Sequence, residues 1–233
     1  MEGAVGVRLP GLSATIVIAV VLGGAAAQAQ QPASPDTTAP QAEAGHRDAP
    51  AQHEASGPVS IAQFLAGGAL GLGLHEAGHV LTASASGASL GLKRVSFGPV
   101  PFFAITHEDV APRREYGISS AGFLMQHASS EWLLTRRPAL RRERAPVAKG
   151  VLAFNLLASA AYGGAALARV GPHERDTRGM AASLGTNERW IGALVLAPAV
   201  LDTVRYCKPG ARWAVWASRG AKVGMVLLAL GAR

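Results

Sequence analysis

The chain has 233 residues, of which 49% are hydrophobic and only 16% are charged, a composition that is unusual for a soluble domain. The formal net charge is +7, but the basic residues lie mostly between apolar segments, which argues against a nucleic-acid partner and for orientation in a lipid bilayer. The single cysteine, Cys207, excludes an internal disulfide framework and a zinc site built from cysteines.

The N-terminal part of the chain has the pattern of an export signal. Residues 1–29 combine the basic Arg8 with an apolar core and a small-residue cleavage site, and an uncleaved membrane anchor is the alternative. Residues 30–57 are rich in Pro, Ala and Gln with almost nothing to bury, which predicts a disordered linker. We therefore expect residues 58–233 to form one membrane-embedded domain.

Residues 58–85 are apolar and long enough to cross a bilayer, and they carry His75, Glu76 and His79. Histidines four residues apart lie on one face of a helix, so both imidazoles can bind a single zinc ion. Glu76 can then accept a proton from a metal-bound water. The alternative is a pair of helix histidines bonded to neighbouring polar groups, but burying three ionisable groups in an apolar segment without a function is costly.

A different pattern follows the first helix. Residues 87–105 alternate Val and Phe around Gly98 and Pro99, which predicts two short strands joined by a turn, with an amphipathic loop as the alternative. The glycine-rich composition, including Gly67 and Gly71 on the first helix, is typical of close helix packing in lipid.

An apolar helix with His-Glu-x-Gly-His, followed by Phe97, Gly98 and Pro99, resembles the site-2 protease family of intramembrane zinc metalloproteases. The resemblance implies a zinc cofactor and cleavage of membrane protein substrates within the bilayer. In that family a small sheet follows the first catalytic helix and presents the substrate in extended form, so Phe97, Gly98 and Pro99 are candidate substrate-binding residues. The implied fold is an all-α polytopic membrane protein, a small transmembrane helix bundle with a short β-hairpin after the first catalytic helix.

Residues 116–135 are similar in part to the family's Ala-Gly-Pro-Leu-Ala-Asn segment, with Phe123 in place of the proline. Both ends of this segment are basic, which favours a re-entrant or interfacial helix over a full crossing. His127 and Glu131 are possible metal ligands, but a helix pair that faces water is the favoured interpretation.

Residues 147–170 are apolar enough to span a membrane. Their main polar group, Asn155, is expected to hydrogen-bond across helices or to hold a substrate backbone. Residues 171–187 have mixed charge and are expected to form an outer loop, and residues 211–233 a tilted or partial span.

Within residues 190–206, Asp202 is the only acidic residue. With Pro198 and Leu201 it resembles the family segment whose aspartate supplies the third zinc ligand. The alternative is that Asp202 pairs with Arg205 near the interface.

The direction of the helices determines whether Asp202 can be a zinc ligand. If residues 58–85 and 190–206 run in the same direction, Asp202 lies at the depth of the two histidines. If residues 116–135 cross fully, Asp202 moves to the opposite side.

We therefore expect an intramembrane zinc endopeptidase in which His75, His79 and Asp202 hold the metal and Glu76 handles protons. It is expected to be a multi-pass protein of a bacterial inner membrane, with the lipid bilayer and a membrane protein substrate as partners. The alternatives are a non-enzymatic multi-pass membrane protein that binds metal or a partner, and a small transporter with an intramembrane His/Asp relay.

Overall fold

The computed structural model describes residues 57–97 and 100–231. The expected signal (residues 1–29), nearly all of the expected linker, and the turn residues Gly98 and Pro99 lie outside these ranges. The elements follow one another as α2 (Gly57–Ala85), β1 (Leu90–Phe97), β2 (Val100–His107), α3 (Pro112–Arg136), α4 (Pro146–Ala168), α5 (Asp176–Ser183), α6 (Glu188–Cys207) and α7 (Arg212–Gly231).

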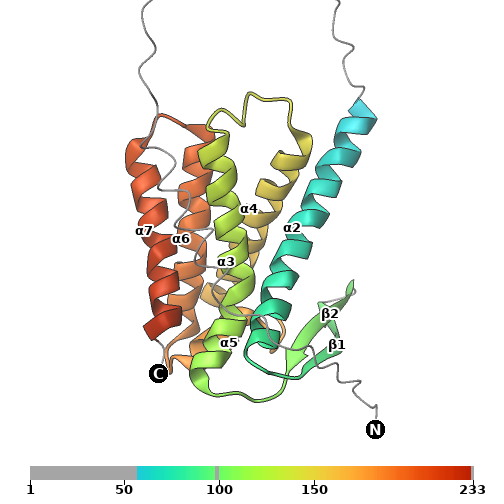
Figure 1. Ribbon diagram of the computed structural model, residues 1–233, viewed down its shortest axis with the longest axis vertical. Helices are drawn as coiled ribbons and strands as arrows, with labels where there is room; N and C mark the ends of the chain where they lie inside the picture. The colour runs from blue at the N-terminus through green and yellow to red at the C-terminus, as the bar shows by residue number, and fades with distance from the viewer. Residues whose placement is uncertain (1–56, 98–99, 232–233) are drawn as a thin grey trace, which may run out of the picture.

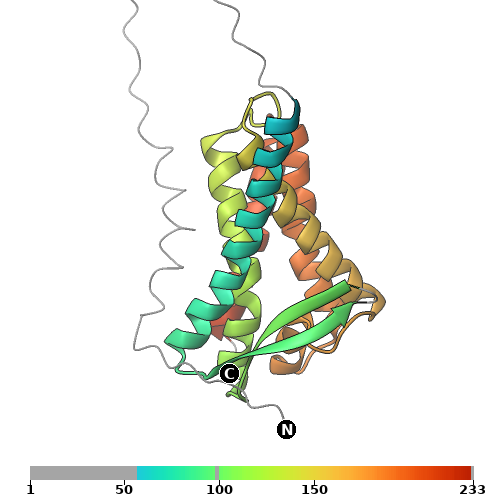
Figure 2. The same cartoon turned by 90° about the vertical axis from the view of Figure 1, so that its right-hand side faces the viewer.

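The five long helices run side by side, and each reverses the direction of the one before it (Figure 1). α2 packs against α3 and α4, while α6 packs against α4 and α7. The short helix α5 and the hairpin lie at the end of the bundle where α2 finishes, and the hairpin crosses that end (Figures 1 and 2). We call this end of the molecule the hairpin end.

The expected helix bundle with a small hairpin is confirmed. Strands β1 and β2 pair antiparallel, with Leu90 opposite His107 and Phe97 opposite Val100. Phe97 and Val100 are the last residues described before and after Gly98 and Pro99, where a glycine followed by a proline predicts the turn.

Within the described part of the chain, four helices, α2, α4, α6 and α7, are long and apolar enough to cross a membrane. Large apolar side chains project from the outside of the bundle, including Leu65, Leu157 and Leu227, which are 63%, 70% and 60% exposed. A soluble bundle would bury such side chains, so the composition and the exposed faces suggest a membrane protein.

Glycines bring α2 and α4 into close contact. A methyl group at Gly71 would lie 2.8 Å from Cδ1 of Phe154, and one at Gly67 would overlap the carbonyl group of Val147. The two glycines therefore allow the backbones to approach as expected for helices that associate in lipid.

Helix α3 differs from the re-entrant or interfacial helix expected from its basic flanks. It is a single unbroken helix of 25 residues, about 37 Å long at 1.5 Å per residue, and it extends along the bundle from the hairpin end (Figure 1). Its polar residues Ser119, Gln126, His127 and Glu131 are buried between neighbouring helices. The low hydropathy of α3 thus arises because its polar residues face the interior of the bundle. It does not mean that α3 lies outside the bundle.

Candidate metal centre

Three potential ligand atoms meet near the hairpin end: Nε2 of His75, Nε2 of His79 and Oδ2 of Asp176. The two imidazole nitrogens are 3.1 Å apart, and each lies 3.4 Å from the carboxylate oxygen. Ligands of a tetrahedral zinc with bonds of 2.0–2.1 Å are about 3.3–3.4 Å from one another, so the triangle matches one face of such a tetrahedron. Within residues 57–97 and 100–231, this is the one group of three such side chains close enough to share an ion.

The chain fixes the orientation of the second imidazole. Nδ1 of His79 lies 2.8 Å from the carbonyl oxygen of Ile118, and since a carbonyl can only accept, Nδ1 must carry the proton. In the neutral ring Nε2 is therefore the nitrogen with the free lone pair, and this is the tautomer that a metal ligand requires. The ring of His75 packs edge-on against Phe123, with centroids 5.5 Å apart and planes at 79°.

Two glycines make room for the imidazoles. A methyl group at Gly122 of α3 would lie 2.5 Å from Nε2 of His79 and 2.6 Å from Nε2 of His75. A methyl group at Gly78, inside the His-Glu-Ala-Gly-His segment, would lie 2.6 Å from the carbonyl oxygen of Ala121. Gly78 and Gly122 therefore let α2 and α3 approach until the imidazoles lie against the α3 backbone.

Asp176 is the first residue of α5, and its neighbours on both sides are anchored. The guanidinium of Arg175 contacts both carboxylate oxygens of Glu188 at 2.8 Å, and the hydroxyl of Thr177 donates to the same carboxylate at 2.9 Å. Burial raises the pKa of Asp176, but the charges and hydrogen bonds of His79 and His75 outweigh burial and hold the pKa below its ordinary value. The carboxylate is therefore in the ionised form in which it can bind a metal.

Glu76 lies beside the centre on the same helix. It is half-buried, and it makes no hydrogen bond or ion pair in the part of the chain that the structure describes. It follows His75 directly on α2 and is three residues from His79. A carboxylate without a partner next to a metal site is suited to accepting a proton.

A cavity of about 210 Å³ opens beside the centre. His79 and Asp176 form part of its wall, together with residues of the hairpin, the first half of α3, the segment before α5 and α5 itself. Lys93 of β1 donates a hydrogen bond to Glu174 at 2.7 Å, so the hairpin is tied to the segment that carries Asp176.

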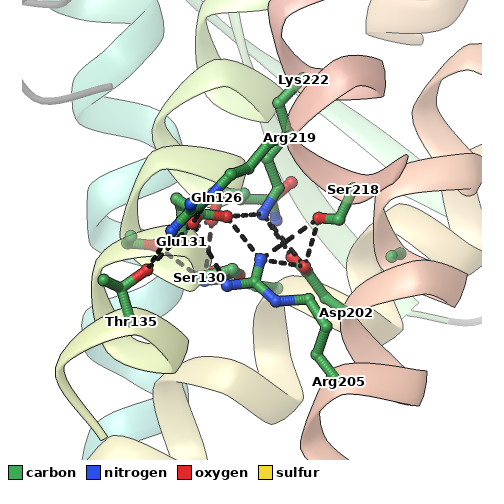
Figure 3. A network of polar contacts seen from close by, with 12 residues as sticks. Gln126, Ser130, Glu131, Thr135, Asp202, Arg205, Ser218, Arg219 and Lys222 are labelled. Carbon is green, nitrogen blue, oxygen red and sulfur yellow. Dashed lines mark hydrogen bonds and ion pairs between the residues drawn. The ribbon is translucent and has the colours of Figure 1, made fainter. Parts of the chain in front are cut away.

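The structure does not bring Asp202 to the two histidines. Its carboxylate is fully buried between α6 and α7, where Oδ1 accepts from Arg205 at 3.0 Å and from Ser218 at 2.6 Å, and Nζ of Lys222 lies 2.8 Å from Oδ2 (Figure 3). The pairing with Arg205, the alternative weighed from the sequence, is thus what the structure shows. Because α3 extends along the bundle, α6 runs opposite to α2, and Asp202 lies away from the hairpin end.

Glu131 belongs to the same group, which we call the ionic cluster: Glu131, Asp202, Arg205, Arg219 and Lys222. Glu131 pairs with Arg205 at 2.5 Å, with Arg219 at 2.8 Å and with Lys222 at 2.9 Å (Figure 3). His127 and Glu131 therefore do not form the expected pair that faces water, since both are buried. The ionic cluster joins α3, α6 and α7, and each charged group in it forms an ion pair with a group of opposite charge.

The remaining candidates from the sequence are Asn155 and the expected substrate-binding residues Phe97, Gly98 and Pro99. Nδ2 of the buried Asn155 lies 2.7 Å from Oγ of Ser129 and 3.1 Å from the carbonyl oxygen of Gln126, so Asn155 links α4 to α3, as one of its two expected roles requires. Phe97 ends β1, and Gly98 and Pro99 lie outside the described residues. Substrate binding by these three residues stays a prediction.

Sequence reasoning missed Asp176 because it assigned residues 171–187 to an outer loop on the far side from the histidines. The signal that could have found it is an acidic residue in the polar segment between α4 and α6. If α3 crosses the bundle fully, this segment lies at the same end as the histidines. Comparisons of the chain with protein-family models, with curated proteins and with solved structures found no match.

Proposed function

We propose that the protein is a zinc-dependent endopeptidase that hydrolyses peptide bonds of membrane-spanning proteins, with His75, His79 and Asp176 as the metal ligands. The observation that carries this proposal is the triangle of ligand atoms, whose sides of 3.1, 3.4 and 3.4 Å match a tetrahedral site. Three protein ligands leave one position open, which distinguishes a catalytic zinc site from a structural one.

The ligand set suits zinc. Two neutral imidazoles and one carboxylate are borderline ligands that zinc accepts, and His79 has the hydrogen-bonded second nitrogen that is usual for a metal ligand. Zinc bound here supplies a Lewis acid that lowers the pKa of a coordinated water to about 7 and polarises the substrate carbonyl.

The residues around the ligands supply the rest of the chemistry. Glu76 accepts the proton of the attacking water and passes it to the leaving amine, which balances the hydrolysis without any further acid or base. The cavity beside His79 and Asp176 gives an extended substrate segment access to the centre from the hairpin. A substrate strand paired with the hairpin would expose its peptide bonds, which a helix conceals.

The exposed tryptophans support a membrane setting. Trp190 near the start of α6 and Trp213 near the start of α7 are 72% and 63% exposed, and the two helices run in opposite directions. Tryptophans are enriched at both membrane interfaces. The 20 residues of α6 rise about 30 Å, which equals the thickness of the hydrocarbon core. The metal centre then lies toward the interface at the hairpin end.

The test is Glu76→Gln in the full-length protein, reconstituted with a panel of single-span membrane proteins as substrates. We expect the wild type to cleave at least one of them, and Glu76→Gln to keep its zinc while losing cleavage. The matched control is Glu143→Gln, which changes a glutamate in the loop between α3 and α4 and should retain full activity.

Three results would contradict the proposal. Equal cleavage by wild type and Glu76→Gln would show that the activity does not arise at this centre. No cleavage of any substrate, together with metal or proton flux in vesicles, would instead favour a transporter, and zinc binding with neither activity would favour a non-enzymatic protein.

A further inference from the structure

Tyr162 of α4 is held against the metal centre by aromatic packing. Its ring lies 5.3 Å from that of Phe123 at an interplanar angle of 80°, and 6.1 Å from the imidazole of His75 at 38°. Phe123 in turn packs edge-on against His75. The three rings hold one another in place, so the tyrosine is oriented before any substrate arrives.

The hydroxyl of Tyr162 has no hydrogen-bond partner within residues 57–97 and 100–231. Its ring packs against the imidazole of His75 from α4, so the tyrosine borders the centre on the α4 side. A phenol keeps its proton at neutral pH and is therefore a hydrogen-bond donor. A half-buried donor that has no hydrogen-bond partner and stands beside a metal-ligand candidate is available to bind a group from outside the chain.

Two other donors near the centre already have partners. The hydroxyl of Ser119, which lines the cavity, donates to Glu115 at 2.7 Å. The guanidinium of Arg175 donates hydrogen bonds to the carboxylate of Glu188. Peptide hydrolysis places negative charge on the carbonyl oxygen, and a preorganised donor aimed at that oxygen is among the largest contributions to catalysis.

We propose that Tyr162 is a catalytic residue that donates a hydrogen bond from its hydroxyl to the carbonyl oxygen of the scissile peptide as that oxygen becomes negatively charged. The tyrosine keeps its proton throughout, and Glu76 alone transfers protons. This role rests on the proposed endopeptidase function and adds a donor that stabilises the oxyanion from the α4 side.

The test compares Tyr162→Phe with Tyr116→Phe in the reconstituted protein. Tyr116 is a matched control, because its hydroxyl is also without a partner in the described chain but is sealed in the core. We expect Tyr162→Phe to lower kcat about 10²–10³-fold, the range for removal of one oxyanion donor, with KM, zinc content and thermal stability unchanged. Tyr116→Phe should match the wild type in all four measurements.

A second readout does not depend on turnover. A phosphinic peptide carries a tetrahedral oxyanion, and its affinity should fall by a similar factor in Tyr162→Phe and stay unchanged in Tyr116→Phe. Wild-type kcat in Tyr162→Phe, or a loss explained by zinc content or stability, would overturn the role of Tyr162 alone. If the wild type cleaves nothing, or Glu76→Gln cleaves as well as the wild type, the proposed function fails and this role fails with it.

Discussion

Replacing Asp202 with alanine should destabilise the fold without removing the metal. Asp202 is fully buried, and its carboxylate pairs with Arg205 and with Lys222 at 2.8–3.0 Å. Removing it leaves the three cations of the ionic cluster with Glu131 as their only carboxylate. Breaking a buried pair in this way costs roughly 3–5 kcal/mol, a large part of the about 5–15 kcal/mol that stabilises a typical domain.

The assay is equilibrium unfolding in mild detergent, combined with zinc analysis of the folded fraction. We expect Asp202→Ala to lower the free energy of unfolding by about 3–5 kcal/mol and to leave zinc per folded chain unchanged. Asp176→Ala should lose zinc instead. In the double variant Asp202→Ala with Lys222→Met, a cation is removed together with its partner, so much of the lost stability should return. Loss of zinc in Asp202→Ala at unchanged stability would refute this reasoning.

Two further predictions concern the surroundings of the metal centre. Gly122→Ala places a methyl group 2.5–2.6 Å from both imidazole nitrogens, so zinc content should fall sharply, while Gly220→Ala on α7, where a methyl group meets nothing within 4 Å, should bind zinc normally. Glu188→Gln weakens the anchor of Arg175 beside Asp176, so chelator competition should show an affinity for zinc about 10–100-fold lower, as for other residues that orient ligands. Unchanged affinity in Glu188→Gln would mean that α5 is held by other contacts.

The parts of the fold that depend on local signals could be predicted from the sequence. The first helix was expected at residues 58–85 and is found at Gly57–Ala85, because an uninterrupted apolar segment determines its own length. The hairpin followed from strand residues around Gly98 and Pro99. The histidine pair followed from the spacing of four residues on a helix.

The parts that depend on distant partners could not be predicted. Glu131 looks like a water-facing residue in the sequence, because its partners Arg205 and Lys222 lie more than 70 residues further along the chain. The third ligand could not be predicted for the same reason, because its place in the bundle depends on how distant helices pack. Whether Asp176 or Asp202 meets the histidines depends on whether α3 extends along the bundle, and the hydropathy of α3 does not reveal a helix whose polar side is turned inward.

The identity of the third ligand is the most direct test of the proposed centre, and a ligand exchange can measure it. In a Cys207→Ser background, which has no other thiol, X-ray absorption at the zinc edge would be recorded for Asp176→Cys and for Asp202→Cys. We expect a zinc–sulfur distance of about 2.3 Å in Asp176→Cys, and only nitrogen and oxygen at about 2.0–2.1 Å in Asp202→Cys. A zinc–sulfur contact in Asp202→Cys, or zinc bound without sulfur in Asp176→Cys, would contradict the centre formed by His75, His79 and Asp176.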